Sequence, residues 1–487
     1  MADSLKNRTI SGVVWSAIHK FANVFLGFIS GVVLARLLTP HDYGVIGMLA
    51  IFLAVSQTFI DGGFGSALIQ KKNPTDEDYS TILYWNLGLS FFLYFILYMC
   101  APYIAKFYSL PILRDVLRVQ GIVLIINAAR IVQHNQLRKK LQFKKVAVIN
   151  FSANFTALVI TIFLAWKGWG VWALVSQQLL LGLLCTILYW LTSKWRPVLT
   201  FSIASFKELF NFGGFMLLSS LFNTLCNNIQ GLLIGKVYNS STLGYYTKAR
   251  QTEGYASTFI SSVLDQVSYP VLSESQDNCQ RMTGILKRFI GTSAYVTFPM
   301  MLLLIILAKP VFIILYSERW LPSVLYFQIL CLAGIAVCLQ NINYFAVAAI
   351  GKSRELFKWT FVKRGLGLVL VIGGLWLYGI HGLLVGSVLT SWLIYIINAG
   401  LVSKYIGYTI KQQFYDLLPI IILSVVASVI ALSSVVLGIK DLFWGSLLKF
   451  LLFVSAYFLF SIIWKLEFFA LTKETIKMIS QKIKHVH

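Results

Sequence analysis

Long uninterrupted apolar runs constrain this chain more than any other feature. Hydrophobic residues make up 58% of the 487 positions and charged residues only 12%, whereas soluble globular proteins carry roughly 25% charged residues. The runs exceed the roughly 18 residues that indicate a membrane span, and they lack the period-two alternation of barrel strands. Because a helix pairs each backbone N–H within its own segment, the chain is predicted to be an all-α polytopic membrane protein.

The apolar runs predict about fourteen membrane-spanning helices. Their expected ranges are 10–35, 44–69, 81–107, 112–134, 146–166, 170–192, 209–237, 244–272, 285–308, 320–350, 359–379, 381–403, 415–437 and 443–464. The polar and basic stretch before the first run predicts an uncleaved signal anchor.

Lysine and arginine fall mainly on one side of these predicted spans. Of the 41 such residues, about 28 lie at the N-terminal end, in alternate loops and in the C-terminal tail, which the positive-inside rule assigns to the cytoplasm. An even number of spans then places both termini in the cytoplasm. The net charge of +23 therefore indicates topology and contact with anionic lipid rather than a nucleic-acid partner.

An internal repeat divides the chain into similar halves. Residues 31–44 read GVVLARLLTPHDYG, and residues 231–244 read GLLIGKVYNSSTLG. Each copy is an apolar helix end, one cation (Arg36 or Lys236), a polar turn and a glycine expected to open the next helix. Because each repeat unit holds six spans, both halves enter the membrane from the same side. The symmetry axis is then expected to run along the membrane normal, with a cavity between the halves.

This repeat predicts two pseudo-symmetric six-helix lobes and two extra C-terminal helices. The expected parts are an N-terminal lobe at 1–192, an interfacial linker at 193–208, a C-terminal lobe at 209–403, two further helices at 404–464 and a basic cytoplasmic tail at 465–487. The tryptophan, phenylalanine and basic residues of the linker predict a helix that lies at the membrane surface.

No motif for covalent chemistry is present. The six cysteines are scattered without a CxxC pair, so neither a zinc site nor a disulfide framework is expected. The histidines have no spaced catalytic partners, and HExxH, Walker A and GxSxG motifs are absent. The chain is therefore predicted not to be an enzyme and to need no metal or cofactor.

Polar residues interrupt two repeat-related helices at the same depth. His19, Lys20 and Asn23 lie in the first predicted helix, and the seventh carries polar residues at the matching positions. In the seventh helix the spacing i, i+4, i+7 places Asn223, Asn227 and Gln230 on one face. Such residues are expected to line a cavity, although hydrogen bonding between helices within one lobe would also account for them.

Cations outnumber carboxylates among the candidate site residues. The predicted substrate-binding residues are His19, Lys20, Asn23, Arg36, Arg130, Asn223, Asn227, Gln230, Lys248, Arg250 and Lys363, and the candidates for ion coupling are Asp61, Glu253 and Asp265. A basic cavity suits an anionic substrate, since arginine and lysine both bind phosphate.

Structural alternatives stay open for several of these charged residues. Asp61 equally fits a helix cap or an ion pair with a basic neighbour. Lys248 and Arg250 fit a position at the membrane interface. Arg130 and Lys363 fit side chains that snorkel to the cytoplasmic surface.

Several stretches resemble a known group of transporters. Residues 34–50 (LARLLTPHDYGVIGMLA) and 61–72 (DGGFGSALIQKK) are similar to the polysaccharide-transport branch of the multidrug/oligosaccharidyl-lipid/polysaccharide exporter superfamily, the Wzx-like flippases. The stretches 243–251, 269–278 and 308–320 support the resemblance in the second half. The resemblance implies 14 helices in two V-shaped six-helix lobes, with Lys20 at the basic position of the first helix.

The resemblance also implies a function. Such flippases move undecaprenyl-diphosphate-linked oligosaccharide across the bacterial cytoplasmic membrane by alternating access, for lipopolysaccharide, O-antigen or other surface polysaccharide assembly. The implied partners are lipid-linked oligosaccharide, membrane lipid and polysaccharide polymerase or assembly proteins. One alternative is a drug/cation antiporter of the related branch, which would require carboxylates to dominate the site. A glycan-modifying membrane enzyme is a further alternative, but the catalytic loops that it needs are missing.

Overall fold

The chain forms two compact helical units. The structure is a computed structural model, and it describes residues 2–276, 278–433 and 442–464. Throughout these residues every regular element is a helix. The first unit covers residues 1–247 and the second covers 248–487.

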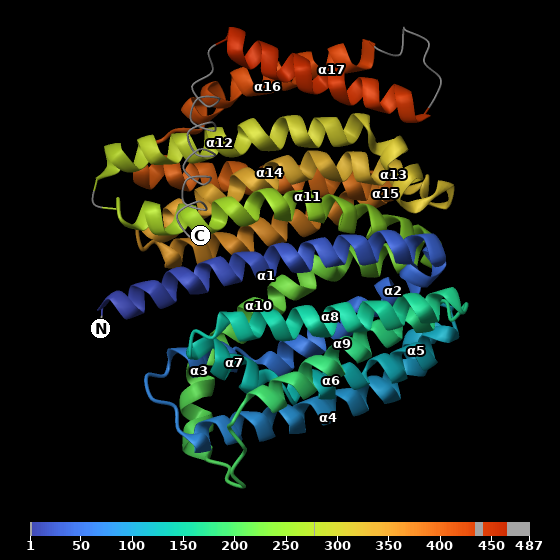
Figure 1. The fold of residues 1–487 in the computed structure, drawn as a ribbon, viewed down its shortest axis with the longest axis vertical. Helices are drawn as coiled ribbons and strands as arrows, with labels where there is room; N and C mark the ends of the chain where they lie inside the picture. Colours follow the sequence, from blue (N-terminus) through green and yellow to red (C-terminus); the bar gives the residue numbers. More distant parts are fainter. Residues whose placement is uncertain (1, 277, 434–441, 465–487) are drawn as a thin grey trace. The chain divides into compact units, whose positions relative to one another are not determined.

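The first unit contains α1 to α10 and the beginning of α11 (Figure 1). Its helices are α1 (Ala2–Leu37), α2 (Pro40–Asp61), α3 (Phe64–Gln70), α4 (Asp76–Phe107), α5 (Ile112–Gln120), α6 (Ile122–Ala128), α7 (Ile131–Lys139), α8 (Phe143–Trp166), α9 (Val171–Thr192) and α10 (Ile203–Val237). Within this unit α4 packs on α6, α6 on α9, and α9 on α8, while α2 contacts α10 and α1 contacts α8.

The second unit contains the rest of α11 and the helices that follow it. They are α11 (Ser240–Ser273), α12 (Cys279–Ile306), α13 (Ala308–Tyr316), the short 3-10 helix η1 (Glu318–Trp320), α14 (Ser323–Ala349), α15 (Ser353–Ile406), α16 (Ile410–Ser433) and α17 (Leu442–Ile463). Helix α14 packs on α12 and α15, and α16 packs on α12 and α17.

Helix α15 is a hairpin of two helical arms. Its backbone leaves the helical region at Tyr378 and Gly379. A Cβ atom on Gly374 or Gly382 would collide with the carbonyl oxygen of the other residue, so only glycine lets the arms approach this closely. The two arms match the helices predicted at 359–379 and 381–403.

Ten helices among the described residues are long and apolar enough to cross a membrane, with α15 counted once. This finding confirms the prediction of an all-α multi-span membrane protein. The number fourteen and the V-shaped pair of lobes stay predictions. The predicted basic tail at 465–487 lies outside the described residues.

The two copies of the repeat form similar elbows, which begin their second helices earlier than predicted. Helices α2 and α11 start at Pro40 and Ser240, about four residues before the expected glycines. Thr39 explains the difference for α2, because its side chain accepts a hydrogen bond from the Asp42 N–H in a capping box, with Pro40 at the first helical position. Asn239 accepts from the Thr242 N–H at 2.8 Å in the second copy.

The linker between the predicted lobes differs from the expected surface helix. Residues 193–202 are not helical, and α10 begins only at Ile203. The linker backbone instead donates to α4 side chains, from Val198 N–H to Ser80 Oγ at 2.9 Å and from Ser202 N–H to Thr81 Oγ1 at 3.0 Å. These bonds replace the internal hydrogen bonds of a helix, so the segment is attached to α4 in an extended form.

An ion-pair cluster strengthens this attachment. Lys71 Nζ lies 3.0 Å from the Asp78 carboxylate and 2.9 Å from the Glu208 carboxylate at the start of α10. Burial works against the charge of Lys71, but the hydrogen bonds to Glu208 and Asp78 outweigh it and raise the pKa of the Lys71 ammonium. The start of α10 is thereby tied to the α3–α4 corner of the first unit.

Candidate functional site

The stretch predicted as one helix at 112–134 is broken into α5, α6 and α7. At the second break, Thr186 and Trp190 of α9 donate to carbonyl oxygens in and just after α6, at 2.9 and 2.8 Å. Lipid offers no water to satisfy carbonyls released from a helix, so these side chains make the break tolerable. Arg130 lies at the break, as the residue that precedes α7.

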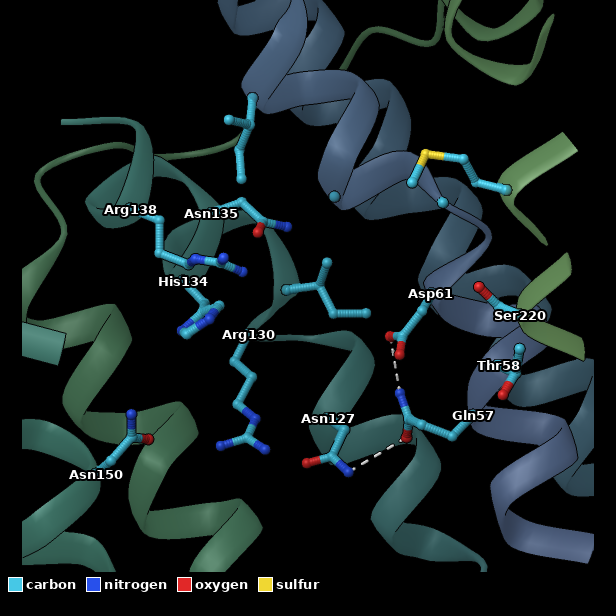
Figure 2. A pocket seen from close by; sticks show the side chains of 15 residues that line it. Gln57, Thr58, Asp61, Asn127, Arg130, His134, Asn135, Arg138, Asn150 and Ser220 are labelled. Carbon is cyan, nitrogen blue, oxygen red and sulfur yellow. Dashed lines mark hydrogen bonds between the residues drawn. The ribbon is translucent and has the colours of Figure 1, made fainter. Parts of the chain in front are cut away.

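Helix α2 ends beside this break, at Asp61. Gly62 and Gly63 follow with φ values of +51° and +72°, in a region that favours glycine, and they separate α2 from α3. Gln57 Nε2 donates to Asp61 Oδ1 at 3.0 Å, and Asn127 Nδ2 donates to Gln57 Oε1 at 3.3 Å (Figure 2). The carboxylate is therefore held by an amide pair, one member of which comes from α6.

Three nitrogen-bearing side chains share one face of the α7 segment. Arg130, His134 and Arg138 follow the spacing i, i+4, i+8, which places them in a row. Figure 2 shows this row around a pocket that also receives Asp61. The cavity has a volume of about 600 Å³. Its lining residues are Gln57, Thr58, Asp61, Gly63, Gly65, Ile69, Asn127, Arg130, Ile131, His134, Asn135, Arg138, Asn150, Met216 and Ser220.

Lys139 fixes two walls of this pocket to each other. Its ammonium donates to the carbonyl oxygens of Leu68 at 2.9 Å and Ile69 at 3.3 Å, and to that of Lys71. The last carbonyls of a helix carry partial negative charge and need donors. A cation from α7 therefore caps the end of α3, which positions the row of three side chains against the end of α2.

The charge balance of the pocket favours an anion. Two guanidinium groups face one carboxylate, and the charge of Arg130 acts on Asp61. Guanidinium groups bind carboxylate and phosphate through paired N–H donors, and such contacts strengthen where water is scarce. The pocket can therefore bind an anionic group at its guanidinium groups, and its neutral amide and hydroxyl side chains can form hydrogen bonds beside that group.

Comparison with known proteins places the chain in a family. The family described as polysaccharide biosynthesis protein matches residues 33–325, which is more than half of the chain. The chain belongs to this family. The match includes every residue that lines the pocket.

Two relatives whose names describe polysaccharide biosynthesis match most of the chain. The teichuronic acid biosynthesis protein TuaB of Bacillus subtilis (strain 168) is 27% identical over 418 residues, covering 82% of this chain and 86% of TuaB. The lipopolysaccharide biosynthesis protein WzxC of Escherichia coli (strain K12) is 23% identical over 441 residues, covering 86% of this chain and 88% of WzxC.

Solved structures share the fold. The lipid II flippase MurJ in an inward closed conformation matches with a TM-score of 0.75 at 16% identity, over 93% of this chain and 99% of MurJ. An inward-facing multidrug resistance transporter of the MATE family, in the MOP superfamily, matches with a TM-score of 0.64 at 16% identity, over 81% of this chain and 98% of that transporter. These likenesses confirm the fold that the sequence predicts.

The pocket brings together two of the site residues that the sequence predicts, Asp61 and Arg130. It also contains His134, Arg138 and Asn150, which the sequence analysis did not propose as site residues. The i, i+4, i+8 spacing of the row was the signal that could have identified His134 and Arg138.

The predicted polar face of α10 has more than one role. Asn223 Nδ2 donates to the Ser219 carbonyl of its own helix at 3.0 Å, and Gln230 accepts from the Tyr246 hydroxyl. Asn227 is exposed, and Asn23 on α1 is half-buried. The α10 residues that line the pocket are instead Met216 and Ser220, and Ser220 lies about one helical turn before Asn223.

Lys248 lies fully buried in the second unit, with 0% exposure. Its ammonium is 4.4 Å from the centroid of the Tyr316 ring and 5.8 Å from that of Trp320. Aromatic faces stabilise a cation that has lost water. Lys248 is thus enclosed by protein, whereas Arg250, two residues on, is exposed. The interfacial alternative for both residues concerns depth in the membrane and stays a prediction.

Lys363 is also inside the second unit, with 5% exposure. Its ammonium donates to Asn398 Oδ1 at 2.7 Å, and Asn398 Nδ2 donates to the Gln340 carbonyl at 3.1 Å. These bonds join the two arms of α15 to α14. The snorkelling alternative for Lys363 therefore does not fit the structure. Glu253 accepts a hydrogen bond from Ser257 on α11.

Two further predicted residues, Lys20 and Arg36, are not among the side chains that line the pocket. Arg36 is exposed at the end of α1, and Lys20 is half-buried near the middle of that helix. Lys236, the repeat partner of Arg36, donates to the Phe107 carbonyl at 2.6 Å and so caps α4. The side chains of His19 and Asp265 lie outside the described part of the chain.

Proposed function

We propose that this chain translocates a lipid-linked oligosaccharide across the bacterial cytoplasmic membrane for surface polysaccharide assembly. The observation that carries the proposal is the pocket of the first unit, where Arg130 and Arg138 outnumber Asp61 between membrane helices. Family membership supports the proposal, as do the roles that the names of TuaB, WzxC and MurJ describe.

In this proposal the substrate is an undecaprenyl-diphosphate-linked glycan. Its diphosphate binds the guanidinium groups, which match phosphate oxygens. The first sugars contact the amides Asn127, Asn135 and Asn150, and the prenyl tail stays in lipid. No covalent bond is made or broken, so the residues only bind, orient and release.

Several finer features belong to the same proposal. Both termini lie in the cytoplasm, and the two predicted lobes alternate access to the two leaflets. Lys20 and Arg250 provide further cationic contacts along the path, as do Asn23, Asn223 and Asn227. A polysaccharide polymerase or another assembly protein receives the product on the far side.

The experiment compares arginine variants in a strain that lacks the native gene. Arg130→Ala and Arg138→Ala should each reduce surface polysaccharide about tenfold or more, because a charge-assisted hydrogen bond to phosphate contributes about 1.5–3 kcal/mol. The matched control is Arg114→Ala, since Arg114 is exposed and pairs with its neighbour Asp115. Membrane abundance is measured in parallel by immunoblotting.

If Arg130→Ala and Arg138→Ala both give normal surface polysaccharide, with the protein at normal abundance in the membrane, the pocket no longer supports the proposed function. The antiporter alternative makes the opposite prediction. A strain without the protein would then become sensitive to cationic drugs while its surface polysaccharide stays intact. A drug-susceptibility profile of that strain separates the two functions.

A further inference from the structure

A chain of four side chains connects the buried core of the first unit to the pocket. Cys185 Sγ donates to Asn150 Oδ1 at 3.5 Å, Asn150 Nδ2 donates to the Tyr189 hydroxyl at 3.1 Å, and that hydroxyl lies 2.9 Å from His134 Nδ1. Cys185 and Tyr189 are each 1% exposed, within an apolar cluster of α7, α8 and α9 side chains. Cys185 and Tyr189 are therefore shielded from bulk water, whereas Asn150 and His134 are half-buried at the pocket.

The direction of the hydrogens in this chain is determined by counting donors. In the structure the Asn150 amide turns its oxygen toward the Cys185 thiol and its NH2 group toward Tyr189. That NH2 group occupies one lone pair of the hydroxyl. The single hydroxyl hydrogen of Tyr189 then points at His134 Nδ1, which accepts it. A neutral imidazole that accepts at Nδ1 carries its own hydrogen at Nε2.

The ring of His134 is held edge-on to Tyr189, with centroids 5.3 Å apart and an interplanar angle of 89°. The Nδ1 edge faces the core, and the residue also lines the pocket, between Arg130 and Arg138 on the same helix face (Figure 2). A protonated ring would need Tyr189 to accept two hydrogen bonds, and it would add a third cation beside two guanidinium groups. Both effects favour the neutral form.

We propose that His134 contacts the substrate, donating from Nε2–H to a non-bridging oxygen of the diphosphate between the two arginines. Tyr189 and Asn150 are positioning residues that hold the donor tautomer. The proposal rests on the proposed function, since it assigns one more donor to the same anion site. It also explains why a neutral donor, rather than a third cation, stands in the middle of the row.

Binding of farnesyl diphosphate to the purified full chain in lipid nanodiscs tests this assignment. His134→Ala should weaken binding about tenfold or more, the loss expected for a hydrogen bond to a charged group. His134→Gln, whose amide reaches the Nε2 position, should bind within about threefold of the unchanged protein. His134→Asn, whose amide reaches only the Nδ1 position, should bind as weakly as His134→Ala.

Tyr189→Phe tests the positioning role, with Tyr295→Phe as the matched control. Both hydroxyls are buried, and that of Tyr295 donates to Ser461 at 2.9 Å in the second unit. Tyr189→Phe should weaken binding of the probe about three- to tenfold, whereas Tyr295→Phe should leave binding unchanged. Equal binding by Tyr189→Phe and the unchanged protein would overturn the relay.

Nitrogen NMR of the histidine side chains reports which ring nitrogen of His134 carries the hydrogen. A purely structural role of His134 would not make the Nε2 signal respond to the diphosphate. In protein labelled at its six histidines, the signals missing from His134→Gln belong to His134. They should report a bare Nδ1 and a protonated Nε2, and farnesyl diphosphate should shift the Nε2 signal. A hydrogen on Nδ1 of His134 would contradict the proposal.

Failure of this proposal is distinguishable from failure of the proposed function. If Arg130→Ala and Arg138→Ala bind farnesyl diphosphate like the unchanged protein, the pocket is not the diphosphate site. If those variants lose binding while His134→Ala and Tyr189→Phe retain it, the pocket stands and the His134 assignment is wrong.

Discussion

Asp61 is the single carboxylate among the residues that line the pocket of the first unit, and its setting differs from that of an ordinary ion pair. It is the last residue of α2, it accepts from Gln57, and it feels the charge of Arg130. A substrate phosphate would compete with Asp61 for that same arginine. Asp61 therefore stays a candidate for ion coupling, because a cation or proton on its carboxylate would change the charge that a bound phosphate meets in the pocket.

The residue-level prediction concerns Asp61→Asn. This change keeps the hydrogen bond with Gln57 and removes a negative charge that would repel the diphosphate of the substrate. We expect tighter binding of farnesyl diphosphate and flipping that no longer depends on the coupling gradient. The measurement is flipping in vesicles while the proton and sodium gradients are collapsed one at a time. Full gradient dependence in Asp61→Asn would show that coupling occurs elsewhere, with Glu253 and Asp265 as the remaining candidates.

At the scale of elements, the two elbows contact each other across the repeat. A Cβ on Gly44 would overlap the backbone carbonyl of Ser240, and a Cβ on Gly244 would overlap that of Pro40. His41 Nδ1 lies 2.6 Å from Ser240 Oγ at the same crossing. The starts of α2 and α11 therefore cross backbone to backbone, which explains the two glycines better than a role in opening a helix.

The element-level prediction follows from this crossing. Gly44→Ala should lower the unfolding midpoint of detergent-solubilised protein, because backbone atoms cannot yield and overpacking costs about 1–3 kcal/mol. The control is Gly88→Ala in α4, where a Cβ would meet nothing within 4 Å. That control should leave the midpoint unchanged or raise it, since alanine favours helix over glycine. Equal midpoints for the two variants would mean that the crossing is looser than described.

For the whole molecule, charge asymmetry predicts how the chain is inserted. Loops with many cations are expected in the cytoplasm, since the bias of Lys and Arg sets orientation. Lys140 and Lys352 lie at such places, and both are exposed. Lys167 at the α8–α9 turn and Tyr378 at the tip of the α15 hairpin lie at the opposite ends of their helices, and both are also exposed.

This prediction can be checked by labelling single cysteines in a cysteine-free background of the full chain. A membrane-impermeant thiol reagent added to intact cells should label Lys167→Cys and Tyr378→Cys. Lys140→Cys and Lys352→Cys should react only after permeabilisation. The reverse pattern would place the termini outside the cytoplasm. A pattern that differs between the halves would contradict the parallel repeat, because both halves are expected to enter from one side.

The sequence alone was enough for the helical class, the repeat, the family and two members of the pocket, Asp61 and Arg130. These follow from local physics, because a backbone in lipid must pair within its own segment and an ionisable residue there is conspicuous. Both facts can be read from the composition and the spacing of residues, and neither depends on how the helices pack.

Only the tertiary structure decided which of the candidates meet and what partners they have. The break before α7 is tolerated because α9 side chains satisfy its carbonyls, and no local pattern at 112–134 reveals that help. His134 gains a defined donor direction from Tyr189 and Asn150 on two other helices, while Lys363 and Lys248 are held inside the second unit. Such partners depend on how helices pack against one another, and the helical periodicity of a single segment does not encode that packing.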